Sequence, residues 1–481
     1  MIDKLRRSTP RVGFFAVGHS AYWAQFPGLR ERLCRHHAAM GERIGARGAE
    51  IVEFGLIDES TAAYDAVDRI AGARLDVLFV DMVTYATSSV FAPIVVNTRL
   101  PIVLIAVQPL AELDYTRAST EMQLENDNIC SVPEFIGVAE RLGNPVTDVV
   151  IGHFEDDPAV DEQLAEWIRI ASALNGVRRA RLGLMGHVLE SMYDMHADPT
   201  AITATFGCHV PLLEVDDVIA LRREVTDARV EAEKARILSL FDTPDPESDP
   251  VTRRLTAADL EASARTSVAL HDLAEKYSLD GLAYYYEGLD GSEHRDVVGS
   301  FIVGNSLLIA AGVPMCGEAD IKTCIAMLIM ERMGIGGSFA EFHPFDFAGG
   351  FILLGHDGPH HVEIADGRPV LRSLVKYHGK PGHGASVEFT IKEGPITMLS
   401  ISLTREGRFR FVVGEGESRR GPIPPTGNTN TRAFFEPDVR SFVKKWVMAG
   451  PTHHFALGIG HHARTIEKLA RALGVECRVV D

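Results

Sequence analysis

The chain has few cysteines, and they are widely separated. Six occur in 481 residues, with no CxxC pair. A set this sparse does not build a disulfide framework and is typical of a reducing compartment. We therefore expect free thiols and a cytoplasmic location. The six are Cys34, Cys130, Cys208, Cys316, Cys324 and Cys477.

Long apolar runs and excess positive charge are also missing. No stretch reaches the roughly 18 consecutive apolar residues that indicate a membrane-spanning helix. The apolar stretch VGFFAVG at 12–18 is too short for a signal-peptide core. The net charge is −18, whereas binding to nucleic acid requires clustered Lys and Arg. These absences argue against nucleic-acid and membrane partners.

Two common catalytic fingerprints are absent as well. The first strand-like run is followed by AVGHSAYW at 16–23, which lacks the GxGxxG pattern of dinucleotide-binding domains. No GxSxG nucleophile elbow is present. Nothing in the sequence around Cys130 or Cys316 indicates a lowered thiol pKa. A dinucleotide domain or a serine or cysteine nucleophile therefore receives little support.

The first two thirds of the chain instead alternate short apolar runs with amphipathic segments. This alternation is typical of βαβ units on a parallel sheet. In the first third we expect strands at 11–17, 49–55, 75–82 and 100–107, with helices at 26–48 and 61–73. A second α/β segment begins near Arg178, with long helices expected at 225–241 and 260–278.

After about Gly334, alternating strand patterns rich in glycine and histidine take over, and a helix and a strand close the chain at 461–481. Such patterns predict an antiparallel, barrel-like domain. The predicted organisation is an α/β fold with three domains. They are an N-terminal α/β domain (1–175), a central α/β domain (176–330) and a C-terminal β-rich domain (331–481).

Four residues have the chemistry of a metal site: Glu318, Glu341, His356 and His454. Two carboxylates with two imidazoles suit Mn²⁺, Fe²⁺, Co²⁺ or Zn²⁺. Each residue also has an ordinary structural explanation. Glu318 could be an acid at a helix start, Glu341 a solvent-facing strand residue, and the histidines a turn cap and a buried structural residue. The cluster HDGPHH at 356–361 is an alternative metal site.

Two neighbouring patterns predict structure rather than chemistry. After Glu318, apolar residues recur at helical spacing, which predicts a helix with one buried face; they are Ile321, Cys324, Ile325, Leu328 and Ile329. The aromatic run 284–286 is expected to be the core of a strand, with a sugar-stacking wall as the alternative.

Four motifs occur in a recognisable order: GEADIKT (317–323), GGSFAEFHPFDF (336–347), LLGHDG (353–358) and AGPTHHF (449–455). In this order they resemble the L-arabinose isomerase / L-fucose isomerase superfamily, closer to the L-arabinose isomerase branch. The similarity is colinear over nearly the whole chain. It implies two Rossmann-like α/β domains with parallel sheets, a C-terminal antiparallel barrel-like domain, and a homo-oligomer, either a trimer or a hexamer.

The resemblance also implies a site and a reaction. One ligand comes from each motif, so Glu318, Glu341, His356 and His454 would hold one divalent ion, most of them from the C-terminal domain. We expect Mn²⁺ first, with Co²⁺, Fe²⁺ and Zn²⁺ as alternatives. If the last motif is shifted by one residue, His453 is the ligand instead.

The implied activity is aldose–ketose isomerisation, an intramolecular oxidoreductase reaction on a free pentose, hexose or deoxy sugar. It proceeds through a cis-enediol(ate), with the ion as Lewis acid and Glu318 and Glu341 transferring the proton. Asp320 and Lys322 are expected behind the ligands. The positions expected to contact the sugar are Gln123, Asn126, Val188, Tyr286 and His453.

Several positions depart from the family pattern. GHSAYWAQFPG (18–28) and ENDNICSVPEF (125–135) stand where the family has other sugar-pocket segments, and Ile321 and Phe342 replace a tryptophan and an aspartate. The sequence therefore names no particular sugar. Another metal-dependent reaction on a sugar or sugar acid, such as epimerisation or dehydration, and a non-catalytic sugar-binding role stay open.

Overall fold

The computed structural model describes residues 2–6, 9–189, 192–245, 247–249, 255–289, 291–373 and 384–481. The chain separates into two compact units, Ser8–Asn175 and the rest, which comprises Met1–Arg7 and Gly176–Asp481. Each unit is described by itself. The predicted division into three domains stays a prediction.

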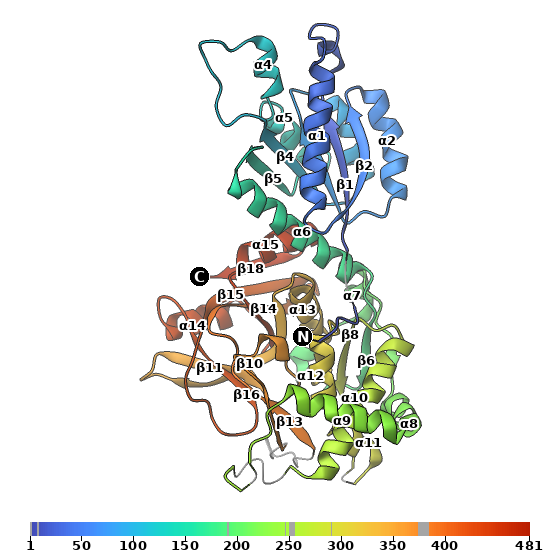
Figure 1. The fold of residues 1–481 in the computed structure, drawn as a ribbon, viewed down its shortest axis with the longest axis vertical. Coiled ribbons are helices and arrows are strands. Elements are labelled where there is room, and N and C mark those ends of the chain that lie inside the picture. The colour runs from blue at the N-terminus through green and yellow to red at the C-terminus, as the bar shows by residue number, and fades with distance from the viewer. Residues whose placement is uncertain are drawn as a thin grey trace. The chain divides into compact units, whose positions relative to one another are not determined.

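The N-terminal unit is a five-stranded parallel sheet with helices along it (Figure 1). Its strand order, β2-β1-β3-β4-β5, is that of flavodoxin-like folds. The strands are β1 (Arg11–Val17), β2 (Glu50–Ile57), β3 (Val77–Met82), β4 (Ile102–Gln108) and β5 (Asp148–His153). The helices are α1 (Leu29–Gly45), α2 (Ser60–Gly72), α3 (Ala92–Asn97), α4 (Thr120–Glu125), α5 (Val132–Arg141) and α6 (Pro158–Arg178).

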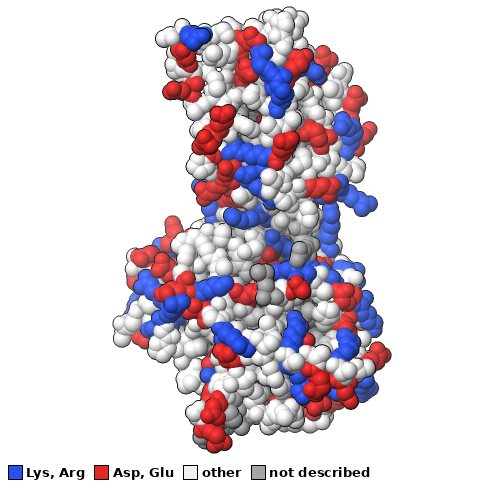
Figure 2. Space-filling view, in the orientation of Figure 1, with Lys and Arg blue, Asp and Glu red and all other residues white. Residues whose placement is uncertain are grey.

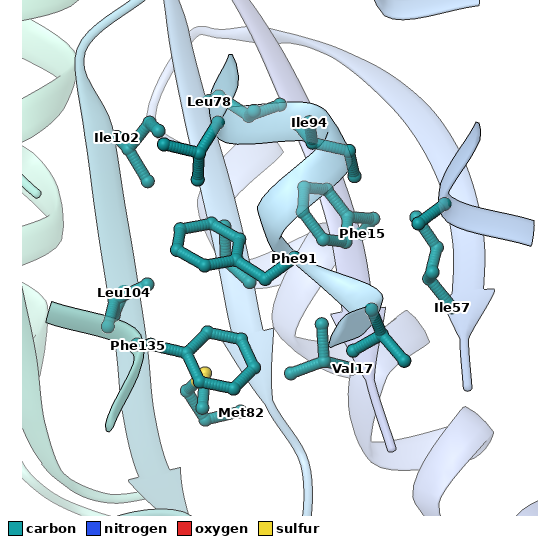
Figure 3. Packing of buried hydrophobic residues seen from close by; sticks show 14 of the residues in the cluster. Phe15, Val17, Ile57, Leu78, Met82, Phe91, Ile94, Ile102, Leu104 and Phe135 are labelled. Atoms are coloured by element: carbon teal, nitrogen blue, oxygen red, sulfur yellow. The ribbon is translucent and has the colours of Figure 1, made fainter. Parts of the chain in front are cut away.

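The core of this unit explains why its strands read as continuous apolar runs. Every residue of β3 is buried, because helices cover both faces of a parallel sheet. Figure 3 shows Phe91 and Phe135 packed together beside Met82, and the two rings stack at a centroid distance of 4.8 Å. A buried histidine of this unit has two carboxylate partners: His37 contacts Asp81 at 2.8 Å and Glu53 at 2.9 Å.

The second unit begins with a four-stranded parallel sheet of order β7-β6-β8-β9. The strands are β6 (Leu182–Gly186), β7 (Leu212–Leu213), β8 (Gly281–Tyr285) and β9 (Met315–Cys316). The accompanying helices are α7 (Pro199–Phe206), α8 (Val215–Glu224), α9 (Asp227–Leu240), α10 (Ala257–Lys276), α11 (Glu293–Val298), α12 (Phe301–Ala310) and α13 (Ile321–Arg332).

A closed antiparallel barrel follows in the same unit. Its six strands run β14-β17-β10-β11-β16-β15, and pairing of β14 with β15 closes the ring. Closure pairs the two end strands of the ring with each other. The barrel strands are β10 (Gly336–Asp346), β11 (Phe351–His356), β14 (Gly394–Leu403), β15 (Phe409–Arg419), β16 (Thr429–Phe434) and β17 (Phe455–Ile459). β18 (Glu476–Val480) adds to β15, β12 (Val370–Ser373) pairs with β13 (Ala385–Glu388), and the helices are α14 (Val439–Met448) and α15 (Ala463–Leu473).

The predicted fold class, parallel α/β sheets plus a C-terminal antiparallel barrel, is therefore confirmed. One helix within it is more buried than the sequence pattern predicted. Helix α13 has no exposed face, since all residues from Ile321 to Met330 are buried. The helix packs against β8 of the parallel sheet and against β10, β14 and β17 of the barrel. Its burial is therefore greater than the apolar spacing alone predicts. Even Lys322 is only 1% exposed.

The surface and the thiols fit an ordinary globular chain. Figure 2 shows acidic and basic side chains interspersed over the visible face of each unit. None of the described helices combines the length and the apolar character that crossing a bilayer requires. All six cysteines are free thiols, as expected.

Candidate metal centre

Glu318 lies in the turn between β9 and α13, but it does not cap the helix. Asp320 is the N-cap, because its carboxylate accepts hydrogen bonds from the backbone N–H groups of Lys322 and Thr323, each at 3.2 Å. Glu318 and Ala319 have φ angles of 58° and 57°. This left-handed region is uncommon for residues other than glycine, and such strain often accompanies functional sites.

The barrel positions the other three predicted ligands. Glu341 on β10 is paired with Gly355 of β11, the residue before His356. His454 immediately precedes β17, which pairs with the other side of β10. The rings of His356 and His454 lie 5.2 Å apart, and both pack on Phe339 at 4.2 and 4.4 Å.

The donor atoms of these residues converge. Glu318 lies 3.7 Å from His454 (Oε2 to Nε2) and 3.9 Å from His356 (Oε1 to Nε2). Donor atoms of Glu341, His356 and His454 all lie within 4.8 Å of one another. The structure thus brings the four residues together, while their role as ligands stays a prediction.

Two buried donors at this point fit a cation. Oε2 of Glu318 and Nε2 of His454 are buried and have no hydrogen-bond partner. Leaving such a group unsatisfied costs about 1–3 kcal/mol. A divalent ion would satisfy both atoms, and the mixture of carboxylate and imidazole donors suits a first-row transition metal.

The charges of Glu341 and His356 are set by their neighbours. Burial disfavours the charged form of Glu341, but His343, at 3.4 Å, and the nearby imidazoles of His356 and His454 outweigh it and lower its pKa to about 2. Burial also opposes the charge on His356, yet Asp357 and the two glutamates raise its pKa to about 9. Glu341 is therefore ionised at neutral pH, and a bound ion would displace the proton from His356.

The two ring nitrogens of His356 have different surroundings. Nδ1 accepts the backbone N–H of Gly358 at 3.0 Å and lies 3.2 Å from Asp357 Oδ1. Nε2 lies 3.9 Å from Glu318 Oε1 and faces the centre.

His454 is held by a buried carboxylate. Asp320 Oδ2 lies 3.2 Å from His454 Nδ1 and accepts the hydroxyl of Thr323 at 2.7 Å, while Lys322 Nζ donates to Oδ1 at 3.3 Å. Burial raises the pKa of Asp320, but Lys322 and His454 outweigh this effect and hold it well below its usual range. Burial and nearby His356 lower the pKa of His454. A neutral imidazole that donates Nδ1–H to a carboxylate is the usual form of a metal-ligating histidine.

His453 has a carboxylate partner that the sequence analysis did not identify. Asp194, on the short 3-10 helix η3 (Tyr193–Met195), lies 2.7 Å from His453 Nδ1 and accepts the His453 backbone N–H at 3.1 Å. This contact lowers the pKa of Asp194 to about 2, and it outweighs burial to raise the pKa of His453. Nε2 of His453 lies 3.9 Å from Glu318 Oε2.

Comparisons with known proteins agree with this arrangement. Residues 336–476 match the L-arabinose isomerase C-terminal domain family. The chain is 27% identical to the L-arabinose isomerase of Nocardioides sp., over 78% of this chain and 73% of that protein. It is 23% identical to that of Geobacillus thermodenitrificans, over 83% and 80%, and 24% identical to that of Aeromonas hydrophila, over 84% and 80%. The chain is thus similar to L-arabinose isomerases over most of its length. The resemblance inferred from the four motifs is confirmed, and the matched segment contains Glu341, His356 and His454.

Some of the predicted sugar contacts belong to the second unit and some to the N-terminal unit. Val188 follows β6, and its carbonyl lies 3.0 Å from Nδ1 of His187; Tyr286 follows β8 and stacks on His294 at 5.3 Å. The preceding tyrosines, Tyr284 and Tyr285, are buried in β8, as expected for strand core. Gln123 and Asn126 belong to the N-terminal unit, where the Asn126 amide bonds the backbone of Leu110 and Met122. All five expected sugar contacts, His453 included, stay predictions.

The alternative metal site at HDGPHH is not supported. Nδ1 of His360 bonds Ser338 Oγ at 3.0 Å, and Nε2 donates to the His356 carbonyl at 2.9 Å. Nε2 of His361 lies 3.0 Å from Glu331. Burial lowers the pKa of His360 to about 3, so it stays neutral. His360 therefore fixes the backbone of a predicted ligand rather than forming a centre of its own.

Proposed function

We propose that the chain is a cytoplasmic, homo-oligomeric aldose–ketose isomerase that depends on a divalent metal and acts on a free pentose, hexose or deoxy sugar. The observation that carries the proposal is that donor atoms of Glu341, His356 and His454 converge and that Glu318 lies within 3.9 Å of both imidazoles, while Glu318 Oε2 and His454 Nε2 are buried without partners. Relatives named L-arabinose isomerases support the reaction class. The resemblance suggests a trimer or a hexamer.

The four residues would hold the ion through two carboxylates and two imidazole nitrogens. We propose Mn²⁺, with Co²⁺, Fe²⁺ and Zn²⁺ as the alternatives that the same donors accept. When bound, the ion supplies Lewis-acid stabilisation of the negative charge that develops on the sugar oxygens.

The carboxylates would move the proton. Isomerisation of an aldose transfers hydrogen from C2 to C1, so one group must take a proton from carbon and return it to the neighbouring carbon. Glu341 is ionised at neutral pH and is therefore able to accept a proton. Glu318 lies 3.9 Å from His356 and 3.7 Å from His454 and is the second transfer group. Phe339 packs on both imidazoles and limits access of water from that side.

Two positions that differ from the family pattern serve packing in this chain. Ile321 is buried at the start of α13, and the ring of Phe342 lies 5.4 Å from that of Phe455 and 6.4 Å from that of Trp446. Neither supplies the polar group that the family has there. We therefore propose the class of sugar and leave L-arabinose as one member of the panel to be tested.

The test is a screen of aldopentoses, aldohexoses and deoxy sugars with the Mn²⁺-loaded protein, followed by ¹³C NMR. We expect a ketose from at least one sugar, and loss of both ketose formation and tight Mn²⁺ retention in Glu341→Ala. An epimer or a dehydration product without ketose would indicate another sugar enzyme. Sugar binding without Mn²⁺ or turnover would indicate a binding protein. A fully active, metal-replete Glu341→Ala variant would refute the four-ligand assignment.

A further inference from the structure

The two adjacent histidines of the last motif are held in the same way. His454 directs Nδ1 to the carboxylate of Asp320 at 3.2 Å, and His453 directs Nδ1 to the carboxylate of Asp194 at 2.7 Å. Each ring therefore keeps its hydrogen on Nδ1 and turns Nε2 the other way. A carboxylate on the far nitrogen is the arrangement that fixes the tautomer of histidines that ligate metals.

Both free nitrogens face the same oxygen. Nε2 of His454 lies 3.7 Å and Nε2 of His453 lies 3.9 Å from Oε2 of Glu318. Metal–ligand bonds of about 2.0–2.2 Å place two donors of one ion no more than about 4.4 Å apart. These separations fall within that limit, and the donor atoms of Glu318, His453 and His454 all lie within 4.8 Å of one another.

The two supporting carboxylates are also linked to each other. Lys322 Nζ donates to Asp320 at 3.3 Å and to the carbonyl of Met195 at 2.9 Å. Met195 is the residue after Asp194, so one buried ammonium holds both carboxylate-bearing segments. The backbone N–H of His453 donates to Asp194 as well, which ties that pair at two points.

We propose that His453 is a fifth protein donor of the metal centre, bound through Nε2, and that Asp194 is its positioning residue. The inference rests on the proposed metal site but goes beyond the four ligands that the family motifs imply. It assigns His453 to the metal together with His454, whereas the sequence placed His453 among the sugar contacts or, with a shifted motif, as the ligand in place of His454. Because its side chain is 35% exposed, His453 is the donor at the open side of the centre.

The experiment measures Mn²⁺ binding without sugar, so that its readout is independent of turnover. Metal-free full-length protein is titrated with Mn²⁺, and free Mn²⁺ is followed by electron paramagnetic resonance. We expect His453→Ala and His453→Gln to weaken binding at least about tenfold, with a smaller loss for Asp194→Asn, whose amide oxygen can still accept from Nδ1. X-ray absorption of the Mn²⁺ form should count three imidazoles in the wild type and two in His453→Ala.

Two matched controls come from the same regions. His461 belongs to a second His-His pair, and its Nε2 donates to the Gly416 carbonyl at 3.2 Å, so His461→Ala should bind Mn²⁺ like the wild type. Asp198 caps α7 by accepting from Thr200 N at 2.8 Å. Asparagine caps equally well, so Asp198→Asn should also leave binding unchanged. Circular dichroism melts establish that each variant is folded.

The outcomes separate this inference from the proposed function. If Glu341→Ala loses Mn²⁺ but His453→Ala binds it as tightly as the wild type, with an unchanged imidazole count, His453 is not a ligand and only the inference fails. A wild-type protein that does not bind Mn²⁺, or a Glu341→Ala variant that binds it normally, overturns the proposed centre and the inference together.

Discussion

The buried ammonium of Lys322 offers the sharpest test of how this centre is held in place. It is 1% exposed, and its two partners, the carboxylate of Asp320 and the carbonyl of Met195, are buried as well. Lys322→Met keeps the side chain as far as its ε atom and removes the ammonium group with its charge and hydrogen bonds. The buried Asp320 carboxylate then loses its cation.

The magnitude follows from what remains around Asp320. Breaking a buried ion pair by removing one partner costs about 3–5 kcal/mol. Asp320 keeps the backbone N–H groups of Lys322 and Thr323, the Thr323 hydroxyl and the His454 imidazole as partners. We therefore expect Lys322→Met to lower the free energy of unfolding by about 3 kcal/mol, near the lower end of this range. The assay is hydrogen–deuterium exchange of α13 peptides, which reports the local free energy of opening.

A double-mutant cycle makes the reasoning refutable. Asp320→Asn alone leaves the ammonium without its carboxylate, whereas Asp320→Asn with Lys322→Met removes both charges. We expect the double variant to be more stable than the sum of the two losses predicts, by about 1–3 kcal/mol. Additivity within about 0.5 kcal/mol would show that the two charges do not stabilise each other. We expect the double variant to bind Mn²⁺ more weakly than the wild type, because Asp320→Asn removes the carboxylate that holds His454.

Three further predictions concern the centre, the N-terminal unit and the β6 turn. Mn²⁺ at 100 times its Kd should stabilise the chain by about 2.7 kcal/mol, and EDTA or Glu341→Gln should abolish the resulting rise in Tm; an unchanged rise in the variant would exclude Glu341 as a ligand. Burial opposes the charge on His37, but its two carboxylate partners raise its pKa from 6.5 to about 9. That stabilisation, about 3 kcal/mol at most, is complete below pH 6.5 and lost as the pH rises through 9, and His37→Gln should show no such loss in thermal unfolding. Gly186 has a φ of 77°, and a Cβ there would collide with the backbone carbonyl oxygen of Tyr285, whereas a Cβ at Gly288 would meet the side chain of Tyr286. Because a side chain can move and the backbone cannot, Gly186→Ala should unfold at a lower urea concentration than Gly288→Ala; equal midpoints would contradict this.

Much of the fold follows from local patterns in the chain. Alternating apolar runs and amphipathic segments predict the parallel sheets, and period-two patterns after Gly334 predict the barrel. The apolar stripe of α13 predicts a helix but not its complete burial. Periodicity cannot distinguish a helix covered on one side from one enclosed between a sheet and a barrel, and a lysine in the stripe is normally taken as exposed. Lys322 is buried because its partners come from distant segments.

The candidate site was predicted from short motifs, and its role as a metal centre stays a prediction. Each of the four candidate ligands belongs to a short segment with its own pattern, and the order of the segments indicates that they act together. The contacts behind the ligands have no such signal. Asp194 and His453 are 259 residues apart in sequence, and the pairing depends on where a 3-10 helix meets a barrel strand. His343, which lies 3.4 Å from Glu341, was visible within a quoted motif but has no distinctive spacing.

The start of α13 shows why Glu318 and Asp320 cannot exchange roles. The carboxylate of Asp320 caps the helix and also contacts His454. The start of the helix is therefore fixed to the barrel beside this candidate metal ligand. A second acid at the cap would compete for the same N–H groups. The left-handed pair Glu318 and Ala319 instead reverses the backbone just before the cap and directs Glu318 toward the histidines. That conformation costs about 1–2 kcal/mol per residue, and capping together with the buried helix stabilises it. The strained turn persists because α13, the helix that follows it, is buried between the parallel sheet and the barrel.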